Sequence, residues 1–215
     1  MRLWSWRMTS SKDIPFVSRA GLKLEHALDE FDIDISGLVC ADFGCNVGGF
    51  TDCLLQRGAK LVYAIDTGYG TLAWKLRSDD RVITMERTNA LHAEPPSPFS
   101  GVDLVTIDLA WTQQGHAIPA ALRWLRPSPE SRIITLIKPH YEVTSDEKKT
   151  ILSGGALEEG DAEVIFQRVL EAMQDLGVEV IAHTKSPITG RKSSKGRKGA
   201  GNVEYLTLLK PIAGE

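Results

Sequence analysis

Short apolar runs alternate along the chain with segments whose apolar residues recur every three to four positions. Five apolar residues at helical spacing predict a helix over residues 18–31, with Ser18 as its N-cap. The apolar run at residues 38–43 predicts a strand, and residues 48–57 predict a second helix. The chain therefore enters a strand and leaves it through glycines into a helix.

The same alternation continues to the C-terminus. Further strands are predicted at 60–66, 81–87, 102–110, 132–142 (stopped by Pro139), 178–184 and 202–210, and further helices at 117–125 and 159–176. Strands that alternate with helices predict an α/β fold with a mostly parallel sheet covered on both faces. The last two strands follow each other directly, which predicts an antiparallel pair at one edge.

Composition narrows the class of protein. The chain has 215 residues, of which 42% are hydrophobic and 25% charged, as in soluble globular proteins with one α/β domain. No apolar run reaches the roughly 18 residues of a membrane span, and the N-terminus lacks the apolar core of a signal peptide. We expect a cytoplasmic protein without membrane association, for which Met8 is an alternative start. Cys40, Cys45 and Cys53 are expected to be reduced, buried thiols without a metal.

The glycine-rich turn "ADFGCNVGGF" (41–50) is the first candidate for a binding site. It lacks the G-x-G-x-x-G spacing of dinucleotide-binding turns and has instead Gly44, Gly48 and Gly49, with Asp42 ahead of them. Glycines allow a ligand to approach the main chain and the helix N-terminus. A carboxylate in this place suits a cationic ligand, such as the amino group of S-adenosylmethionine, better than a pyrophosphate.

Polar residues follow four of the predicted strands. Asp42, Asp66, Asn89 and Asp108 lie at strand ends, where ligands bind in open α/β sheets. Asp66 is suited to accept hydrogen bonds from ribose hydroxyls, and Asn89 to meet an adenine edge. The alternative for each is structural, because Asp and Asn favour turns and caps in any protein.

Several motifs resemble one family. The segments "FVSRAGLKL", "DFGCNVGGFTDCLLQRGAKLVYAIDTGYGTLAWKLR", "ERTNA", "LIKPHYEV" and "SPITG…GNVEYL" are similar to FtsJ-like ribose 2′-O-methyltransferases, and within them to the TlyA-like branch. The resemblance runs from Phe16 to Lys210. It implies a Rossmann-like methyltransferase fold with S-adenosylmethionine as cofactor. It also implies RNA as substrate, with rRNA or a ribosomal subunit as partner.

The resemblance also implies roles for residues at matching positions. The family's Lys-Asp-Lys-Glu tetrad matches Lys23, Asp108, Lys138 and Glu204. Together with the glycine turn, the expected cofactor-binding residues are Asp42, Gly44, Asn46, Gly48, Gly49, Phe50, Asp66, Asn89 and Asp108.

Methyl transfer to a ribose hydroxyl requires a proton acceptor and close, in-line placement of the reactants. We assign Lys138 as the base, oriented by Asp108, and expect Lys23 and Glu204 to position the hydroxyl. Two lysines in one pocket are expected to lower each other's pKa. The alternative for Lys138 is an ordinary strand-end lysine that reaches solvent.

The chain departs from the family in three places. TlyA-like proteins usually begin with a small RNA-binding domain, whereas only an arm of 15 residues precedes Phe16 here. We therefore expect a flexible arm (1–15) and a single methyltransferase domain (16–215), without that additional domain. The stretch "LAWTQQGHA" (109–117) is less apolar than in the family and is expected to alter the substrate lip. The segment "GRKSSKGRKGAGN" is longer and more basic than expected, and we interpret it as a mobile loop.

Positive charge is concentrated in residues 185–198 and in the N-terminal arm. Residues 185–198 carry +6 without an acidic residue, whereas the whole chain carries −3, so the remainder carries −9. Such segregation is typical of a protein with one face for a polyanion. We expect the loop at 185–201 and the residue Arg19 to contact RNA. The basic residues expected to make these contacts are Arg19, Lys185, Arg191, Lys192, Lys195, Arg197 and Lys198. The alternative is that the loop is only solvated and does not contact RNA. For the N-terminal arm with Trp4 and Trp6, we favour the corresponding alternative, in which the arm does not contact RNA.

Other functions remain open from sequence alone. One is a methyltransferase for a small molecule or a protein, and another is a non-catalytic RNA-binding protein that retains the fold. The tetrad and the glycine turn together favour the RNA enzyme over both. The haemolysin label used in the TlyA-like branch is disfavoured, because the sequence shows no spanning segment.

Overall fold

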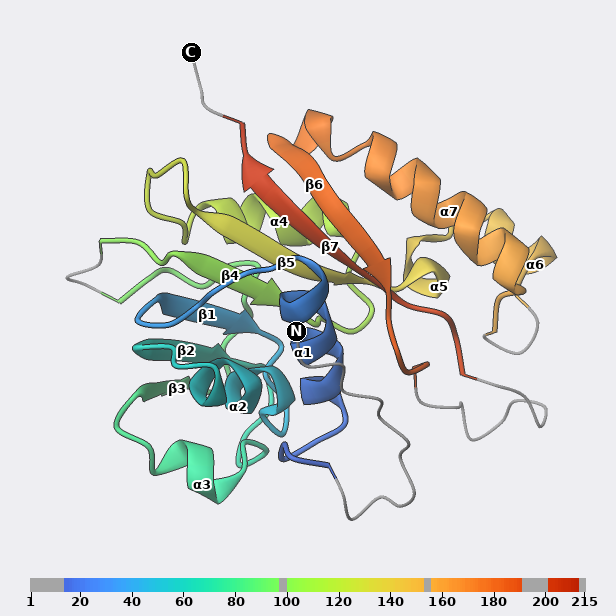
Figure 1. Cartoon of the computed structure of the whole chain (residues 1–215). Coiled ribbons are helices and arrows are strands. Elements are labelled where there is room, and N and C mark those ends of the chain that lie inside the picture. Colours follow the sequence, from blue (N-terminus) through green and yellow to red (C-terminus); the bar gives the residue numbers. More distant parts are fainter. Residues whose placement is uncertain (1–13, 97–99, 153–155, 191–200, 213–215) are drawn as a thin grey trace.

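The computed structural model describes residues 14–96, 100–152, 156–190 and 201–212. Within these ranges, one seven-stranded sheet in the order β3-β2-β1-β4-β5-β7-β6 forms the centre of the molecule (Figure 1). The strands are β1 (Val39–Phe43), β2 (Leu61–Ile65), β3 (Val82–Met85), β4 (Leu104–Ile107), β5 (Arg132–Ile137), β6 (Val178–Lys185) and β7 (Tyr205–Pro211).

The pairing confirms the predicted α/β architecture. Strand β1 is parallel to both β2 and β4, and the parallel part of the sheet extends to β3 on one side and β5 on the other. Strand β7 is antiparallel to β5 and to β6. The chain order reverses between β1 and β4, so their carboxyl ends open the crevice in which ligands of such sheets bind.

Helices cover both faces of the sheet, as predicted. They are α1 (Ala20–Glu30), α2 (Gly49–Gln56), α3 (Trp74–Arg77), α4 (Gln114–Leu122), α5 (Pro139–Glu142), α6 (Glu147–Thr150), α7 (Glu159–Glu171) and the 3₁₀ turn η1 (Gln174–Leu176). Helices α1 and α2 lie in front of the sheet in Figure 1, and α4 lies behind it. In the part of the chain described, no helix is long and apolar enough to cross a membrane.

The structure differs from the predicted elements mainly at short helices. Helices α3, α5 and α6 have four residues each, too few for the apolar period to be recognised. Helix α1 begins two residues after Ser18, whose Oγ accepts a hydrogen bond from the Ala20 amide at 3.3 Å. Residues 138–142 do not continue β5, because Pro139 starts α5 there.

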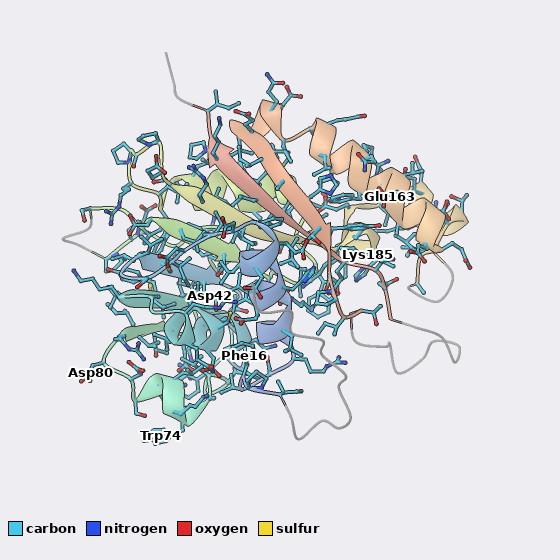
Figure 2. All side chains as sticks on the ribbon, in the orientation of Figure 1. Phe16, Asp42, Trp74, Asp80, Glu163 and Lys185 are labelled. Carbon is cyan, nitrogen blue, oxygen red and sulfur yellow. The ribbon has the colours of Figure 1, made fainter. Side chains whose placement is uncertain are left out.

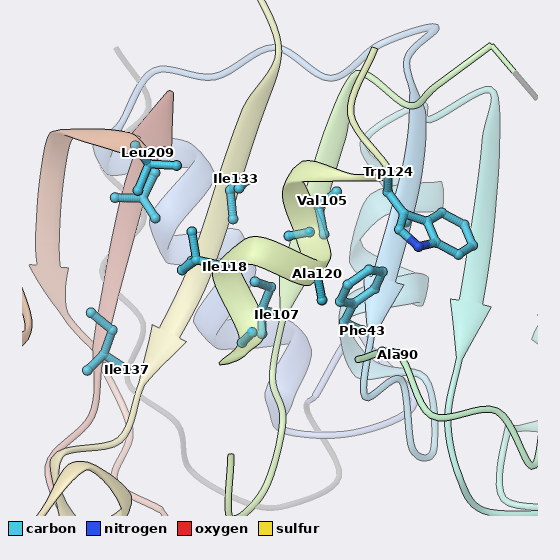
Figure 3. Packing of buried hydrophobic residues seen from close by; sticks show 14 of the residues in the cluster. Phe43, Ala90, Val105, Ile107, Ile118, Ala120, Trp124, Ile133, Ile137 and Leu209 are labelled. Carbon is cyan, nitrogen blue, oxygen red and sulfur yellow. The ribbon is translucent and has the colours of Figure 1, made fainter. Parts of the chain in front are cut away.

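The core has two layers, one on each face of the sheet. Cys40 on β1 packs with α1 and α2, whereas Ala41 and Phe43 pack on the opposite face with α4. This alternation follows from the period of two in a strand. Trp124, fully buried just after α4, meets Phe43 and Tyr63 edge-on with ring centroids 5.7 Å away in each case (Figure 3). One large ring therefore fills the space behind β1 and β2.

We expect Trp124→Ala to lower the free energy of unfolding by about 3–5 kcal/mol, because it leaves a cavity that the surrounding strands cannot fill. Urea denaturation followed by circular dichroism measures this. Trp111→Ala is the matched control, because Trp111 is 84% exposed, and we expect it to change stability by less than about 0.5 kcal/mol. Equal effects of the two variants would contradict the packing described here.

Candidate active site

The glycine-rich turn joins β1 to α2 and has a backbone that few residues other than glycine adopt. Gly44 and Gly48 have φ values of +86° and +102°, and Asn46 has +49°. A Cβ atom at Gly44 would lie 2.7 Å from the backbone oxygen of Asp108, so the turn packs directly on the end of β4. The turn is therefore held close to the residue that follows β4.

A cavity of about 670 Å³ opens beside this turn, at the carboxyl ends of the central strands. It brings together residues that are far apart in the sequence. The sequence-predicted residues that line it are Arg19, Lys23, Gly44, Asn46, Gly49, Phe50, Asp108, Lys138 and Glu204. Asp42, Gly48, Asp66, Asn89 and Lys185 do not line it.

Asp42 has a structural position, and its expected contact with the cofactor stays a prediction. The residue is fully buried, and its carboxylate accepts hydrogen bonds from Thr51 Oγ1 at 2.6 Å and Thr106 Oγ1 at 3.1 Å (Figure 2). Burial raises the pKa of Asp42 to about 7, and the two threonine hydroxyls offset only part of this. Asp42 joins β1, β4 and α2 below the turn and has no contact with the cavity.

Asp66 and Asn89 lie at the ends of β2 and β3, as predicted, but outside the cavity lining. Asp66 accepts hydrogen bonds from the amides of Asn46 at 2.9 Å and Gly68 at 2.7 Å, so it orients the glycine turn. Asn89 is exposed, and its Oδ1 accepts a hydrogen bond from the Leu91 amide. Their roles in cofactor binding stay predictions. The hydrogen bonds that the structure shows for both residues are to backbone amides of the protein itself, as the structural alternative expects.

The space beside Gly48 is filled by protein. A Cβ atom at Gly48 would lie 2.2 Å from Leu76 Cδ1 and 2.8 Å from Leu72 Cδ1. Gly49 is equally crowded, because its Cβ would lie 2.8 Å from Ala20 Cβ and 2.9 Å from the Gly21 amide nitrogen. These glycines allow the turn to pack against α1 and α3, which differs from the expectation that a ligand occupies the space at Gly48.

Two lysine–carboxylate pairs face the cavity. Lys138 Nζ, after β5, lies 2.5 Å from Asp108 Oδ1, and it also donates a hydrogen bond to the Leu109 carbonyl at 3.1 Å. Lys23 Nζ on α1 lies 2.5 Å from Glu204 Oε2, just before β7. Lys23 and Glu204 are both buried. The four residues of the predicted tetrad therefore meet as two ion pairs.

The environment of Lys138 differs from the sequence expectation. Burial lowers the pKa of Lys138, but the charge of Asp108 and the hydrogen bond to it more than offset burial, so the pKa lies above its ordinary value. The sequence argument expected the two lysines to lower each other's pKa. It did not include a separate carboxylate beside each lysine. Lys138 is therefore an ammonium group at neutral pH in the protein without ligands.

Aromatic residues form one rim of the cavity; the sequence argument singled out the segment 109–117, which holds Trp111, but did not give the aromatic rings a role. Tyr141 lines the cavity, with its ring centroid 6.2 Å from that of Trp111 and 4.0 Å from that of His140. Trp111 is 84% exposed and has a φ of +54°, which is strained for an aromatic residue. Burial, with a smaller effect of Lys138, lowers the pKa of His140 to about 4, so its imidazole is neutral. The sequence signal for this rim was the pair of rings His140 and Tyr141, which directly follow the segment "IKP".

At the other rim of the cavity, Gly190 and Asn202 form a narrow neck beside Glu204. The Gly190 amide donates to the Asn202 carbonyl at 3.0 Å, and the Leu157 amide donates to Asn202 Oδ1 at 3.0 Å. A Cβ atom at Gly190 would lie 2.7 Å from Glu204 Oε1. The neck therefore closes directly on a tetrad carboxylate.

The predicted RNA-binding residues are only partly within the described ranges. Arg19 is exposed and lines the cavity. Lys185 is exposed at the end of β6 and forms an ion pair with Glu159 (Figure 2). The other five, Arg191, Lys192, Lys195, Arg197 and Lys198, lie outside the described residues, as do Trp4 and Trp6. The three cysteines are free and buried, as expected.

The fold and the position of the cavity define the class of protein: the chain has the Rossmann-like fold of S-adenosylmethionine-dependent methyltransferases. A likeness to a structure from Pyrococcus horikoshii, provisionally described as an RNA methyltransferase, agrees with this fold, with a TM-score of 0.61 at 15% identity. The model of the FtsJ-like methyltransferase family matches residues 16–196. The chain belongs to this family, which confirms the resemblance inferred from its motifs.

Relatives with names point to one branch. YqxC of Bacillus subtilis, provisionally named an rRNA methyltransferase, is 39% identical over 197 residues, which cover 90% of this chain and 65% of that protein. TlyA of Mycobacterium tuberculosis, named a 16S/23S rRNA (cytidine-2′-O)-methyltransferase, is 38% identical over 91% of this chain and 68% of that protein. The chain thus spans about two thirds of the length of these relatives.

Solved structures agree with this grouping. A protein from Streptococcus thermophilus, provisionally described as a hemolysin, superposes with a TM-score of 0.82 at 35% identity. The superposition covers 94% of this chain and 70% of that one. The similarity therefore extends over nearly the whole chain.

We expect Gly48→Val to lower the free energy of unfolding by more than about 1 kcal/mol, because the new side chain meets Leu72 and Leu76 and φ is positive. Loss of S-adenosylmethionine binding should accompany this destabilisation. Denaturation and calorimetry on the same samples measure both. Gly115→Ala is the control, since nothing lies within 4 Å of its Cβ position. A stable Gly48→Val protein that has lost only cofactor binding would restore the sequence interpretation.

Asp42 should make stability depend on pH. Its pKa is raised from 3.8 to about 7, so the native state keeps a proton that the unfolded state loses, and stability falls as pH rises from about 4 to 7. Asp42→Asn should reduce this fall by roughly 2–4 kcal/mol. Thermal denaturation across that pH range measures it. Asp80→Asn, at an exposed site (Figure 2), should leave the slope unchanged, and an unchanged slope in Asp42→Asn would contradict the assignment.

Proposed function

We propose that this chain is an RNA ribose 2′-O-methyltransferase that uses S-adenosylmethionine, and that its substrate is ribosomal RNA. The observation that carries the proposal is the meeting of two lysine–carboxylate pairs, Lys138–Asp108 and Lys23–Glu204, in one cavity beside the glycine turn. The names of the relatives YqxC and TlyA support RNA, and in particular rRNA, as the substrate.

The cavity fits the proposed cofactor. Gly44 brings bare backbone to its wall, and Asn46, Gly49 and Phe50 complete that side. We assign these four residues to cofactor binding, with Asp66 and Asn89 beyond the edge of the cavity as the further contacts. Bound S-adenosylmethionine supplies an electrophilic methyl group on a positively charged sulfur.

Lys138, Asp108, Lys23 and Glu204, which also line the cavity, supply the groups for proton transfer. Lys138 Nζ accepts the proton of the ribose 2′-hydroxyl while that oxygen bonds to the methyl carbon and the carbon–sulfur bond breaks. Lys138 must first lose the proton that Asp108 stabilises, and a second positive charge in the cavity favours this loss. Lys23 and Glu204 orient the hydroxyl, so the chemistry depends on placement as much as on basicity.

RNA contact is proposed for the rims of the cavity. The exposed ring of Trp111 and the neighbouring ring of Tyr141 offer stacking surfaces for unpaired bases. Arg19 adds a positive charge at the cavity, and the basic residues between 185 and 198 add the phosphate contacts expected from the sequence. A ribosomal subunit is the partner that follows from an rRNA substrate.

The proposal predicts the behaviour of Lys138 variants in single-turnover methyl transfer to rRNA at saturating cofactor. Lys138→Ala should keep S-adenosylmethionine binding but lose on the order of 10²–10⁴ in rate, the usual contribution of a positioned proton acceptor. Lys138→Arg should fail almost as badly, because a guanidinium keeps its proton. The rate should rise with pH in the wild type and not in Lys138→Ala.

Lys60→Ala is the control, because Lys60 is exposed, does not line the cavity and is not among the residues proposed to contact RNA. A Lys138→Arg enzyme with near-normal rate would show that charge matters and not proton transfer. Binding of rRNA without any methyl transfer by the wild type would favour a non-catalytic RNA-binding protein, and transfer to the base instead of O2′ would overturn the proposed reaction.

A further inference from the structure

Glu142 is a half-buried carboxylate that does not line the cavity and has no part in the proposed chemistry. It ends α5, the short helix that also carries His140 and Tyr141. Its Oε1 accepts a hydrogen bond from the backbone amide of Gln114 at 2.9 Å. Gln114 lies 28 residues away in the sequence, at the first position of α4.

This contact solves a local problem at the start of α4. The first amides of a helix have no partner within the helix, and a side chain just before the helix commonly accepts from them. Here Gln113 precedes α4 and makes no such hydrogen bond. Glu142 supplies the acceptor from another element, and its negative charge suits the N-terminal end of a helix.

The side chain of Gln114 secures the same end of α4 to the sheet. Gln114 is buried, and its Oε1 accepts a hydrogen bond from Thr135 Oγ1 on β5 at 2.7 Å. Glu142 is held on its other side by α7, since Arg168 Nη2 donates to the Glu142 carbonyl at 3.2 Å. Arg168 in turn pairs with Glu147 at 2.5 Å.

The contact therefore joins the two segments that carry half of the site. One segment runs from Asp108 to Gln114 and includes Trp111, and the other runs from Lys138 to Glu142 and includes Tyr141. These two segments also meet at the Asp108–Lys138 pair, at the hydrogen bond from Lys138 to the Leu109 carbonyl, and at the Trp111–Tyr141 rings. Glu142–Gln114 is the hydrogen bond that fixes their far ends.

We propose that Glu142 is a positioning residue that holds the Asp108–Gln114 and Lys138–Glu142 segments together as one RNA-binding lip. The inference rests on the proposed function for its kinetic consequence, but the contact itself does not. Gly44 of the glycine turn packs on Asp108 at one end of the lip, whereas Gln114 and Glu142 lie at the other end and do not line the cavity. Glu142 should therefore affect the use of RNA and not the binding of the cofactor.

The charge state of Glu142 offers a direct probe of the contact. Burial raises its pKa to about 7, while the Gln114 amide and the charge of Arg168 act in the opposite direction. These are the two groups that face it, from α4 and from α7. A neutral or an ionised carboxyl can both accept the hydrogen bond, so a glutamine at this position preserves the acceptor.

The kinetic test compares Glu142→Ala with Glu142→Gln. Glu142→Ala should lower kcat/KM for rRNA by on the order of tenfold or more, mainly through KM, because a buried amide loses its acceptor. Calorimetric affinity for S-adenosylmethionine should stay at the wild-type value, and Glu142→Gln should recover most of the loss. Glu147→Gln is the matched control, since it removes a carboxylate from the same Arg168 without touching Gln114.

The structural test follows the Gln114 amide resonance by NMR in the free protein. Its chemical shift should titrate with a midpoint near pH 7 in the wild type and in Glu147→Gln, and should be flat in Glu142→Gln. This readout does not require activity, so it separates failure of the inference from failure of the proposed function. The inference is overturned if the amide does not titrate between about pH 4 and 9, if Glu142→Gln is as impaired as Glu142→Ala, or if Glu142→Ala weakens cofactor and RNA binding equally.

Discussion

The pairing of Lys138 with Asp108, and of Lys23 with Glu204, is the constraint on which the site depends. A buried ammonium group is costly unless a carboxylate lies beside it. Each lysine and its partner come from distant parts of the chain, Lys23 from α1 and Glu204 from the start of β7. The sheet order brings β4 next to β5 and β7 next to β5, so one topology places both pairs in the same cavity. An element that shifted by one residue would leave a buried charge without its partner.

The cavity has two sides with different physical characters. On the side of β1, backbone from Gly44 and Gly49 packs closely against its neighbours, and little side-chain movement is available there. On the side of β5, the rings of Trp111 and Tyr141 are held by short segments and not by long helices. The first side suits an invariant small ligand, and the second suits a polymer whose local shape varies. This division agrees with the arrangement expected when one ligand is common to a whole family and the other differs among its members.

Much of this organisation could be predicted from the sequence, because strand periodicity and strand-end polar residues are local signals. The seven strands and the antiparallel end follow from them, whereas the tetrad positions came from the resemblance to the FtsJ-like family. The hydrogen bonds of Asp42 to two threonine hydroxyls could not be predicted, because a carboxylate before a glycine turn looks the same in sequence whether it faces a ligand or such hydroxyls. Glu142 gave no signal either, since its partner is a backbone amide 28 residues away. Long-range contacts to the main chain leave no pattern of side chains to recognise.

The neck formed by Gly190 and Asn202 has a consequence for the length of the chain between them. Its hydrogen bond already fixes the two ends of the intervening segment at a separation that does not depend on what lies between them. For a closed loop, doubling the number of residues adds only about 0.6 kcal/mol of entropic cost. A change in the length of the chain between positions 190 and 202 would therefore cost the domain little free energy, and it would leave Gly190 in place beside Glu204.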